Sequence, residues 1–280
     1  MQLQTDIVMK KINPFSVLTV IIFAVMMTSC STVAFTGRRR LLLYDDGQIT
    51  SLSDQSYREL IDTVKLSTNV AQTAMVTQVG RRLTSALDVY LRTTGQESLL
   101  KGINWEYKLV QSKQVNAFCM PSGKIVFYEG IMPYCTTPDF VAVVMGHEIA
   151  HAVARHGNER MSQQAVLNTA GVVASELIGY TAKTSYAQDL FNMAYSVGSE
   201  VGVLLPFSRK HELEADEIGL IIMAIAGYDI EQAPIFWQRM MDGGSQQVPE
   251  LFSTHPSDAR RIQSIRNEIP KVRAFVAKIQ

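Results

Sequence analysis

The chain of 280 residues has few cysteines and no excess charge of either sign. It contains 3 cysteines, and its 26 lysines and arginines balance 26 aspartates and glutamates, so the formal net charge is +0. Without a basic excess there is no electrostatic field to attract nucleic acid, and no nucleic-acid-binding motif is present. The composition is otherwise that of a globular protein, with 47% hydrophobic and 19% charged residues. We therefore expect a folded protein that does not bind nucleic acid.

The scarcity of cysteine also limits the kinds of metal site. Neither Cys119 nor Cys135 has metal-ligand spacing to another cysteine, which argues against a structural zinc site rich in thiolates. In an oxidising compartment these two thiols can pair as a disulfide. They can equally remain buried free thiols, and the sequence leaves both alternatives open.

A short apolar run lies near the N-terminus. Two lysines precede FSVLTVIIFAVMM, residues 15–27, which has the length of a signal-peptide core. It falls short of the about 20 apolar residues that a membrane span needs. We predict a signal peptide over residues 1–29, and Met9, which directly precedes the lysines, has the position of the natural start. An ordinary secretory signal or an uncleaved anchor is the alternative to a lipoprotein signal.

The end of this run predicts a lipid anchor. MTSC, residues 27–30, resembles the lipobox of bacterial lipoproteins, in which the cysteine is lipidated, so we predict lipidation at Cys30. Ser31 in place of an aspartate favours the outer membrane, facing the periplasm. Residues 30–53 are then a lipidated tether that leads into a docking arm. Its basic run, residues 38–40, is typical of a solvated surface or a contact with lipid headgroups.

Residues 54–280 have the pattern of one α+β domain that is mainly helical. Helical spacing of apolar residues precedes Gly95, and further helices are expected over residues 137–156, 208–226 and toward 269. Alternation over residues 105–110, 116–121 and 124–130 predicts a small antiparallel sheet, with a hairpin turn at PSGK. Residues 160–205 are rich in small apolar residues and are expected to form packed helices or a lid.

The chemistry begins with VVMGHEIAHAVARHG, residues 143–157, an apolar helix that carries an H-E-x-x-H motif. His147 and His151 lie about 40° apart on one helix face, so both imidazoles can bind one tetrahedral zinc ion. Glu148 lies beside the metal, where it suits a general base for a zinc-bound water. Burying three ionisable groups is costly without such a partner, which favours a metal site over a plain core helix.

A catalytic zinc needs a third protein ligand, and residues near the motif do not supply it. Ala154 and Gly157 exclude the metzincin extension of the motif. His156 lies about 180° around a continuous helix from His147 and is expected to be a surface residue at the helix end. The ligand is therefore expected from another helix.

SRKHELEADEIG, residues 208–219, is the best candidate for that helix. Glu212 and Asp216 lie one turn apart on one face, so Glu212 can bind zinc while Asp216 accepts the N–H of a ligand histidine. Glu214 is expected to point elsewhere. The alternative is an exposed charged patch.

Together these segments resemble the zinc metallopeptidase family that includes HtpX, the CAAX prenyl proteases and the Oma-type and BepA-like enzymes. HEIAH and HELEAD resemble the family's HExxH…ExxAD pattern, and LFSTHPSDARRI, residues 251–262, resembles its THPxxxxRI segment. VNAFCMPSGKIVFYEG, residues 115–130, resembles its NAFxxPxGxIxxxxG strand pair. The resemblance implies a gluzincin-like zincin domain with the small sheet beside the HExxH helix.

The resemblance also implies roles for individual residues. His147, His151 and Glu212 would hold one Zn²⁺, Glu148 would be the catalytic base and Asp216 would orient a ligand. His255 would stabilise an oxyanion or bind the zinc as a fourth ligand in a resting state, unless it only caps the chain before a proline. Arg261 would tie the last helix to the site. Asn116, Ala117 and Phe118 would bind a peptide backbone by strand addition.

The function that follows is a lipid-anchored zinc metalloendopeptidase of the bacterial envelope. Its expected substrates are misfolded or misassembled envelope proteins, and the sequence indicates no particular protein partner. A chaperone-like lipoprotein that binds peptides with little turnover is the first alternative, although the intact Glu148 argues against it. A structural zinc protein is the second, and the absence of cysteines near HEIAH argues against that.

Overall fold

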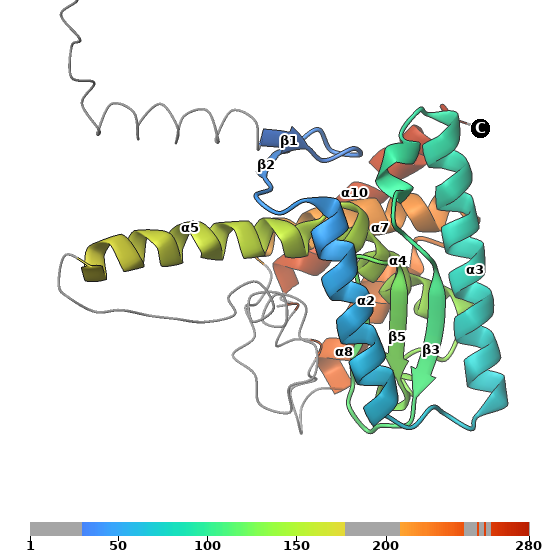
Figure 1. Ribbon diagram of the computed structural model, residues 1–280. Helices are drawn as coiled ribbons and strands as arrows, with labels where there is room; N and C mark the ends of the chain where they lie inside the picture. Colours follow the sequence, from blue (N-terminus) through green and yellow to red (C-terminus); the bar gives the residue numbers. More distant parts are fainter. Residues whose placement is uncertain (1–29, 177–207, 244–250, 252–254, 256–258, 280) are drawn as a thin grey trace, which may run out of the picture.

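The computed structural model describes residues 30–176, 208–243, 251, 255 and 259–279. The predicted signal peptide lies outside the described residues, as does most of the segment expected to form packed helices or a lid. Figure 1 shows α5 extending away from the helices that surround the sheet. Within the described residues, no helix is long and apolar enough to cross a bilayer.

The architecture is the expected α+β one, with helices around two small sheets. The helices are α2 (Asp46–Thr63), α3 (Val70–Thr93), α4 (Pro138–Val153), α5 (His156–Glu176), α7 (Arg209–Ile225), α8 (Gln232–Gly243) and α10 (Ala259–Val276). The strands are β1 (Cys30–Thr32), β2 (Arg39–Leu41), β3 (Glu106–Val110), β4 (Ala117–Cys119) and β5 (Lys124–Tyr128), and short 3-10 turns follow α3 and β5.

The larger sheet differs from the expected antiparallel one. Its strand order is β3-β5-β4, with β4 antiparallel to β5 as the hairpin signal predicted, but β3 parallel to β5. The chain reverses direction between β3 and β4 and again at the PSGK turn, where Gly123 has φ 85. After these two reversals β5 runs in the same direction as β3. It lies between β3 and β4 and pairs with both. Alternation along single strands does not reveal this order.

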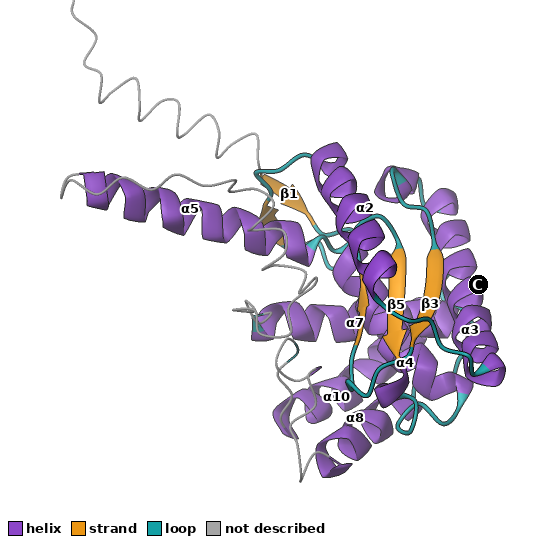
Figure 2. Cartoon of the chain, turned by 60° about the horizontal axis from the view of Figure 1, so that its bottom comes forward, coloured by secondary structure: helices purple, strands orange, loops and turns teal. Residues whose placement is uncertain are grey.

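Both faces of this sheet are covered, which explains why every residue of β5 is buried. Val126 and Tyr128 pack with Tyr57 and Leu60 of α2 on one face. Ile125 and the other residues that point to the opposite face join the main core with α3, α4 and α7. Figure 1 and Figure 2 show α2 along one side of β3 and β5, with α4 beyond the sheet. The sheet therefore fixes α4 in the centre of the molecule.

Helix α4 begins as the sequence predicts but ends earlier. Thr137 accepts a hydrogen bond from the Phe140 amide and Pro138 takes the first turn. The helix was expected to run to about His156, whereas it ends at Val153. Arg155 adopts a positive φ of 54, which turns the chain, and α5 begins at His156. This break changes the direction in which His156 points.

The N-terminal segment is folded onto the domain. Residues 30–53 were expected to be a tether that leads into a docking arm, and within them β1 and β2 form a hairpin and α2 starts at Asp46. In the basic run Arg39 is exposed, whereas Arg38 and Arg40 are not part of a solvated patch. Arg40 is only 4% exposed and donates to the Ala154 carbonyl, and Arg38 pairs with carboxylates of α5 and α7. Paired burial of these charges docks the hairpin.

Helices α4 and α7 approach closely through two glycines. A Cβ on Gly219 would lie 3.0 Å from the amide nitrogen of His147, and one on Gly146 would lie 3.1 Å from the Gly219 carbonyl oxygen. Both contacts are with backbone, which cannot rotate away. The absence of side chains at these positions lets α7 place its polar face directly beside the histidines of α4.

Replacing Gly219 by alanine should therefore separate the two helices and destabilise the fold. We expect Gly219→Ala to lower the free energy of unfolding by about 1–3 kcal/mol, the usual cost of overpacking, in denaturant titrations of the metal-free protein. Ser51→Ala, at an exposed residue of α2, is the control and should be neutral or slightly stabilising, because alanine favours a helix. Equal stability of the two variants would contradict the proposed close contact.

Candidate metal centre

Helix α4 brings three ionisable side chains into the core. His147, Glu148 and His151 are between 2% and 4% exposed. The two imidazoles lie on the same face, and their Nε2 atoms are 3.1 Å apart. The spacing argument from the sequence is confirmed in this respect, because residues one helical turn apart converge on one point.

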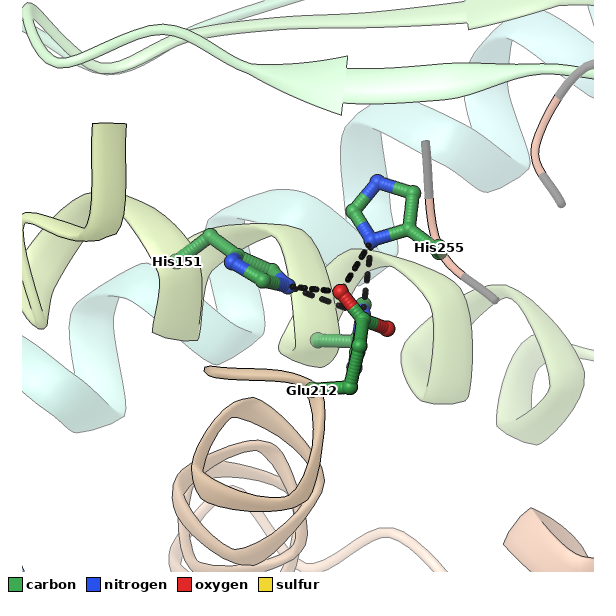
Figure 3. A group of neighbouring side chains, drawn as sticks. His151, Glu212 and His255 are labelled. Atoms are coloured by element: carbon green, nitrogen blue, oxygen red, sulfur yellow. Dashed lines mark hydrogen bonds and ion pairs between the residues drawn. The ribbon is translucent and has the colours of Figure 1, made fainter. Parts of the chain in front are cut away.

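Helix α7 and the segment before α10 complete the cluster. Glu212 places Oε2 3.3 Å from His147 Nε2 and Oε1 3.3 Å from His151 Nε2. His255 places Nδ1 3.0 Å from Glu212 Oε1 and 3.2 Å from His147 Nε2. Figure 3 shows His151, Glu212 and His255 pointing toward one another. Three separate segments of the chain therefore converge on this point.

The donor set fits a metal ion. One ligand atom from each of His147, His151, Glu212 and His255 lies within 4.8 Å of the others, and all four residues are buried. A tetrahedral zinc ion with bonds of about 2.0 Å holds its ligand atoms about 3.3 Å apart, which matches the separations found here. Imidazole nitrogens and a carboxylate oxygen are also ligands that zinc prefers.

Asp216 contacts Nδ1 of His147, the ring nitrogen that faces away from the cluster, and Arg261 binds Asp216. Asp216 Oδ1 lies 2.9 Å from His147 Nδ1, which leaves Nε2 directed at the cluster. Arg261 donates to both oxygens of Asp216, at 2.7 and 2.8 Å, and its Nη1 lies 2.9 Å from Glu212 Oε2. Its guanidinium also stacks 4.2 Å from the Trp237 ring centroid. The last helix is thus tied to the site, as Arg261 was expected to do.

Glu148 lies beside the cluster rather than in it. Its Oε1 is 3.5 Å from Nε2 of His255, and the residue is 3% exposed. Burial raises the pKa of this carboxyl to about 7, although the neighbouring His255 acts in the opposite direction. A carboxyl with such a pKa can both accept and return a proton near neutral pH.

His156 was predicted to be a surface residue, and this prediction is wrong. It is fully buried, and its Nδ1 lies 2.9 Å from Nδ1 of His151. The geometric argument assumed a continuous helix, whereas the positive φ at Arg155 redirects His156 toward the far side of His151. Burial lowers the pKa of His156 to about 4 despite the adjacent Glu214, so its imidazole is neutral at physiological pH. The only signal in the sequence was a third histidine close to the two of the H-E-x-x-H motif.

Glu214 points away from the cluster, as expected, but it is not exposed. It accepts from Nε2 of His156 at 2.9 Å and from Nε of Arg38 at 2.6 Å. Arg38 also binds both oxygens of Glu159, at 2.8 and 2.7 Å. Burial alone would raise the pKa of Glu159, but hydrogen bonds from Arg38 and His211 lower it to about 2. Sequence spacing gave no indication of these long-range pairs.

The two core cysteines do not pair. Both are buried and free, and the Cys119 thiol donates to the Met120 carbonyl oxygen at 3.5 Å. Cys119 belongs to β4, whereas Cys135 precedes α4, and each thiol is enclosed in the main apolar core. Of the two alternatives that the sequence left open, the structure has the free thiols rather than the disulfide.

The predicted peptide-binding strand lies next to the histidine helix. Ala117 and Phe118 belong to β4, which is the outer strand of the sheet and packs against α4. Asn116 precedes it and accepts a hydrogen bond from the Ala117 amide at 2.9 Å. The edge of β4 is therefore near the metal cluster.

Comparisons with known proteins agree with this site. A model of peptidase family M48 matches residues 71–269. The mitochondrial metalloendopeptidase OMA1 of Arabidopsis thaliana is 38% identical over 164 residues, covering 59% of this chain and 31% of the relative. The corresponding protein of Homo sapiens is 30% identical over 264 residues, covering 93% and 49%. The beta-barrel assembly-enhancing protease of Escherichia coli K12 is 26% identical over 240 residues, covering 83% and 46%. The chain spans at most about half the length of these relatives.

The state of the thiols can be measured directly. In the Cys30→Ser variant, purified without reductant, we expect Ellman's reagent to find two thiols per chain in guanidinium chloride, because Cys119 and Cys135 are free. In the native protein neither should react, since burial raises the pKa of both thiols. Finding no thiols after unfolding would mean that the two cysteines are paired.

Proposed function

The chain belongs to peptidase family M48, and from that premise we propose that it is a zinc metalloendopeptidase. In this proposal His147, His151 and Glu212 hold one Zn²⁺, and Glu148 is the general base. The observation that carries it is the buried cluster of four ligand atoms with a carboxyl of raised pKa directly beside it. The named relatives are metalloendopeptidases or proteases, which supports the same activity.

A bound zinc ion and the protein side chains would have different roles in peptide hydrolysis. A zinc ion bound here would supply Lewis acidity, which polarises a peptide carbonyl and makes water a better nucleophile. Glu148 accepts a proton from the attacking water and returns it to the departing amine. Asp216 keeps the N–H of His147 on Nδ1, so that Nε2 presents its lone pair to the ion. Arg261 neutralises Asp216 and so makes its burial tolerable.

We propose two roles for His255, one as a fourth zinc ligand and one as a donor to an oxyanion. Its Nδ1 is part of the ligand cluster in this structure, which supports the fourth-ligand role that the sequence suggested. Four protein ligands are typical of a closed site, whereas catalytic zinc sites keep one position open. We therefore propose that His255 would hold the ion only in a resting state, and that during hydrolysis it would donate to an oxyanion instead.

The substrate is proposed to bind as an extra strand along β4. An edge strand offers backbone donors and acceptors at regular spacing, and Ala117 and Phe118 belong to the edge strand β4, which packs against α4. Strand addition requires an extended peptide, which unfolded or misassembled proteins present. Since one relative is a beta-barrel assembly-enhancing protease, we propose such proteins of the bacterial envelope as substrates, with the enzyme lipid-anchored at Cys30 in the outer membrane.

Glu148→Gln should abolish most of the activity without removing the metal. We expect cleavage of an unfolded protein to fall at least about 100-fold because the general base is lost, while zinc content stays unchanged because Glu148 is not a ligand. Glu231→Gln, at a half-exposed residue paired with Arg273, is the matched control and should cleave normally. Equal cleavage by wild type and Glu148→Gln would refute the mechanism. Bound zinc and bound peptide without turnover in wild type would favour the chaperone-like alternative.

The lipid anchor has an independent test in cells. Globomycin, which blocks lipoprotein signal peptidase, should cause a larger precursor that retains residues 1–29 to accumulate. The Cys30→Ser variant should not be labelled by radioactive palmitate, whereas wild type should be. If globomycin leaves the size of the protein unchanged, an ordinary signal peptide or an uncleaved anchor replaces the lipobox.

A further inference from the structure

A second buried polar cluster lies on the far side of His151 from the metal ligands. We define this support cluster as Arg38, His156, Glu159, His211 and Glu214. We propose that the β1-β2 hairpin, through Arg38 and this support cluster, positions His151 for metal binding. The proposal rests on the proposed zinc site, and it assigns His156 and Arg38 as positioning residues that do not touch the ion.

A continuous line of short contacts joins the hairpin to the ligand. Arg38 Nε lies 2.6 Å from Glu214 Oε2, which lies 2.9 Å from His156 Nε2. His156 Nδ1 lies 2.9 Å from His151 Nδ1. The opposite nitrogen of His151, Nε2, faces Glu212 in the metal cluster at 3.3 Å. Each of these residues is at least four-fifths buried, so water does not compete for the contacts.

Metal binding determines where each proton lies along this line. If His151 gives the lone pair of Nε2 to a metal, its proton must be on Nδ1. Across the 2.9 Å contact with His156, that proton is donated when Nδ1 of His156 is the acceptor, and His156 then carries its own proton on Nε2. The carboxylate of Glu214 accepts this second proton in a hydrogen bond. The arrangement therefore selects the tautomer of His151 that can bind a metal.

Arg38 makes this arrangement tolerable electrostatically. Glu214 and Glu159 are both buried carboxylates, and Arg38 binds the first through Nε and the second through both terminal nitrogens. Such paired contacts are the strongest kind of hydrogen bond in proteins, whereas buried carboxylates left without a cation are costly. Thr36, from the same hairpin turn, donates to the other oxygen of Glu214. The hairpin thus supplies an arginine that lies between these two carboxylates and binds both.

The other ligand histidine is held by a parallel arrangement within the domain. Asp216 accepts from His147 Nδ1 and is itself held by Arg261. His151 is held in a similar way, except that His156 lies between it and the carboxylate of Glu214. The arginine that binds this carboxylate, Arg38, comes from the N-terminal hairpin rather than from α10. Docking of the hairpin and the geometry of the metal site are therefore linked.

Measuring the zinc affinity of the full-length protein distinguishes a role in positioning His151 from a general effect on stability. Arg38→Gln and His156→Phe each remove one residue from the line of contacts that joins the hairpin to His151. The phenyl ring in His156→Phe keeps the ring contact with His211, whose ring centroid lies 4.6 Å from that of His156. The matched control is Arg82→Gln. Arg82 braces the opposite end of α7 by donating to the carbonyls of Ala226 and Gly227 at 2.6 and 2.9 Å. The measurements are zinc affinity by chelator competition, the visible spectrum of the Co²⁺-substituted protein, and the melting temperature of the metal-free protein.

We expect Arg38→Gln and His156→Phe to weaken zinc binding about 10- to 100-fold, the usual effect of losing a group that orients a ligand histidine. Their Co²⁺ spectra should change, because the donor orientation changes. His156→Asn, which keeps an amide oxygen near the position of Nδ1, should recover part of the affinity. Arg82→Gln should lower the melting temperature but leave zinc affinity and the Co²⁺ spectrum unchanged.

Two results would overturn the proposal. One is a zinc affinity in both Arg38→Gln and His156→Phe within twofold of the Arg82→Gln value. The other is a loss of zinc affinity that Arg82→Gln shares in proportion to its own loss of melting temperature, because the effect would then be one of general stability. Failure of the zinc site itself is distinguishable, because then wild type would bind no zinc.

Discussion

The close packing of α4 against α7 is the contact on which the rest of the structure depends. Gly146 and Gly219 have no side chains to hold the two backbones apart, so the third ligand candidate on α7 reaches the histidines of α4. The same approach places Asp216 against His147. The sheet and α3 then pack around α4 and hold it in place. The candidate metal site therefore depends on the packing of two helices at Gly146 and Gly219.

The domain can bury so many ionisable groups because these groups are paired with one another. His147 is supported by Asp216 and Arg261, and His151 by His156 and Glu214. An isolated buried charge costs several kcal/mol, whereas paired and hydrogen-bonded groups largely offset that cost. The partners come from regions far apart in the chain, so the site can form only after the whole domain has folded around it.

Much of this arrangement was predictable because its signals are local. The N-cap of α4, the strands β4 and β5 with their turn, and the convergence of His147 and His151 all follow from residues within a few positions of one another. The failures have a common cause. The parallel pairing of β3, the burial of Arg38 and the position of His156 depend on contacts between distant segments or on one backbone angle.

The sequence by itself determined which residues are candidates for the chemistry, because helical periodicity places His147 with His151, and Glu212 with Asp216, on one helix face. It did not determine what surrounds them. Only the tertiary structure decided that Arg38 belongs to the support of His151 and that His156 is buried beside it. The physical reason is that a buried charge takes whichever partner the fold brings within about 3 Å, and that choice is not recorded in local spacing.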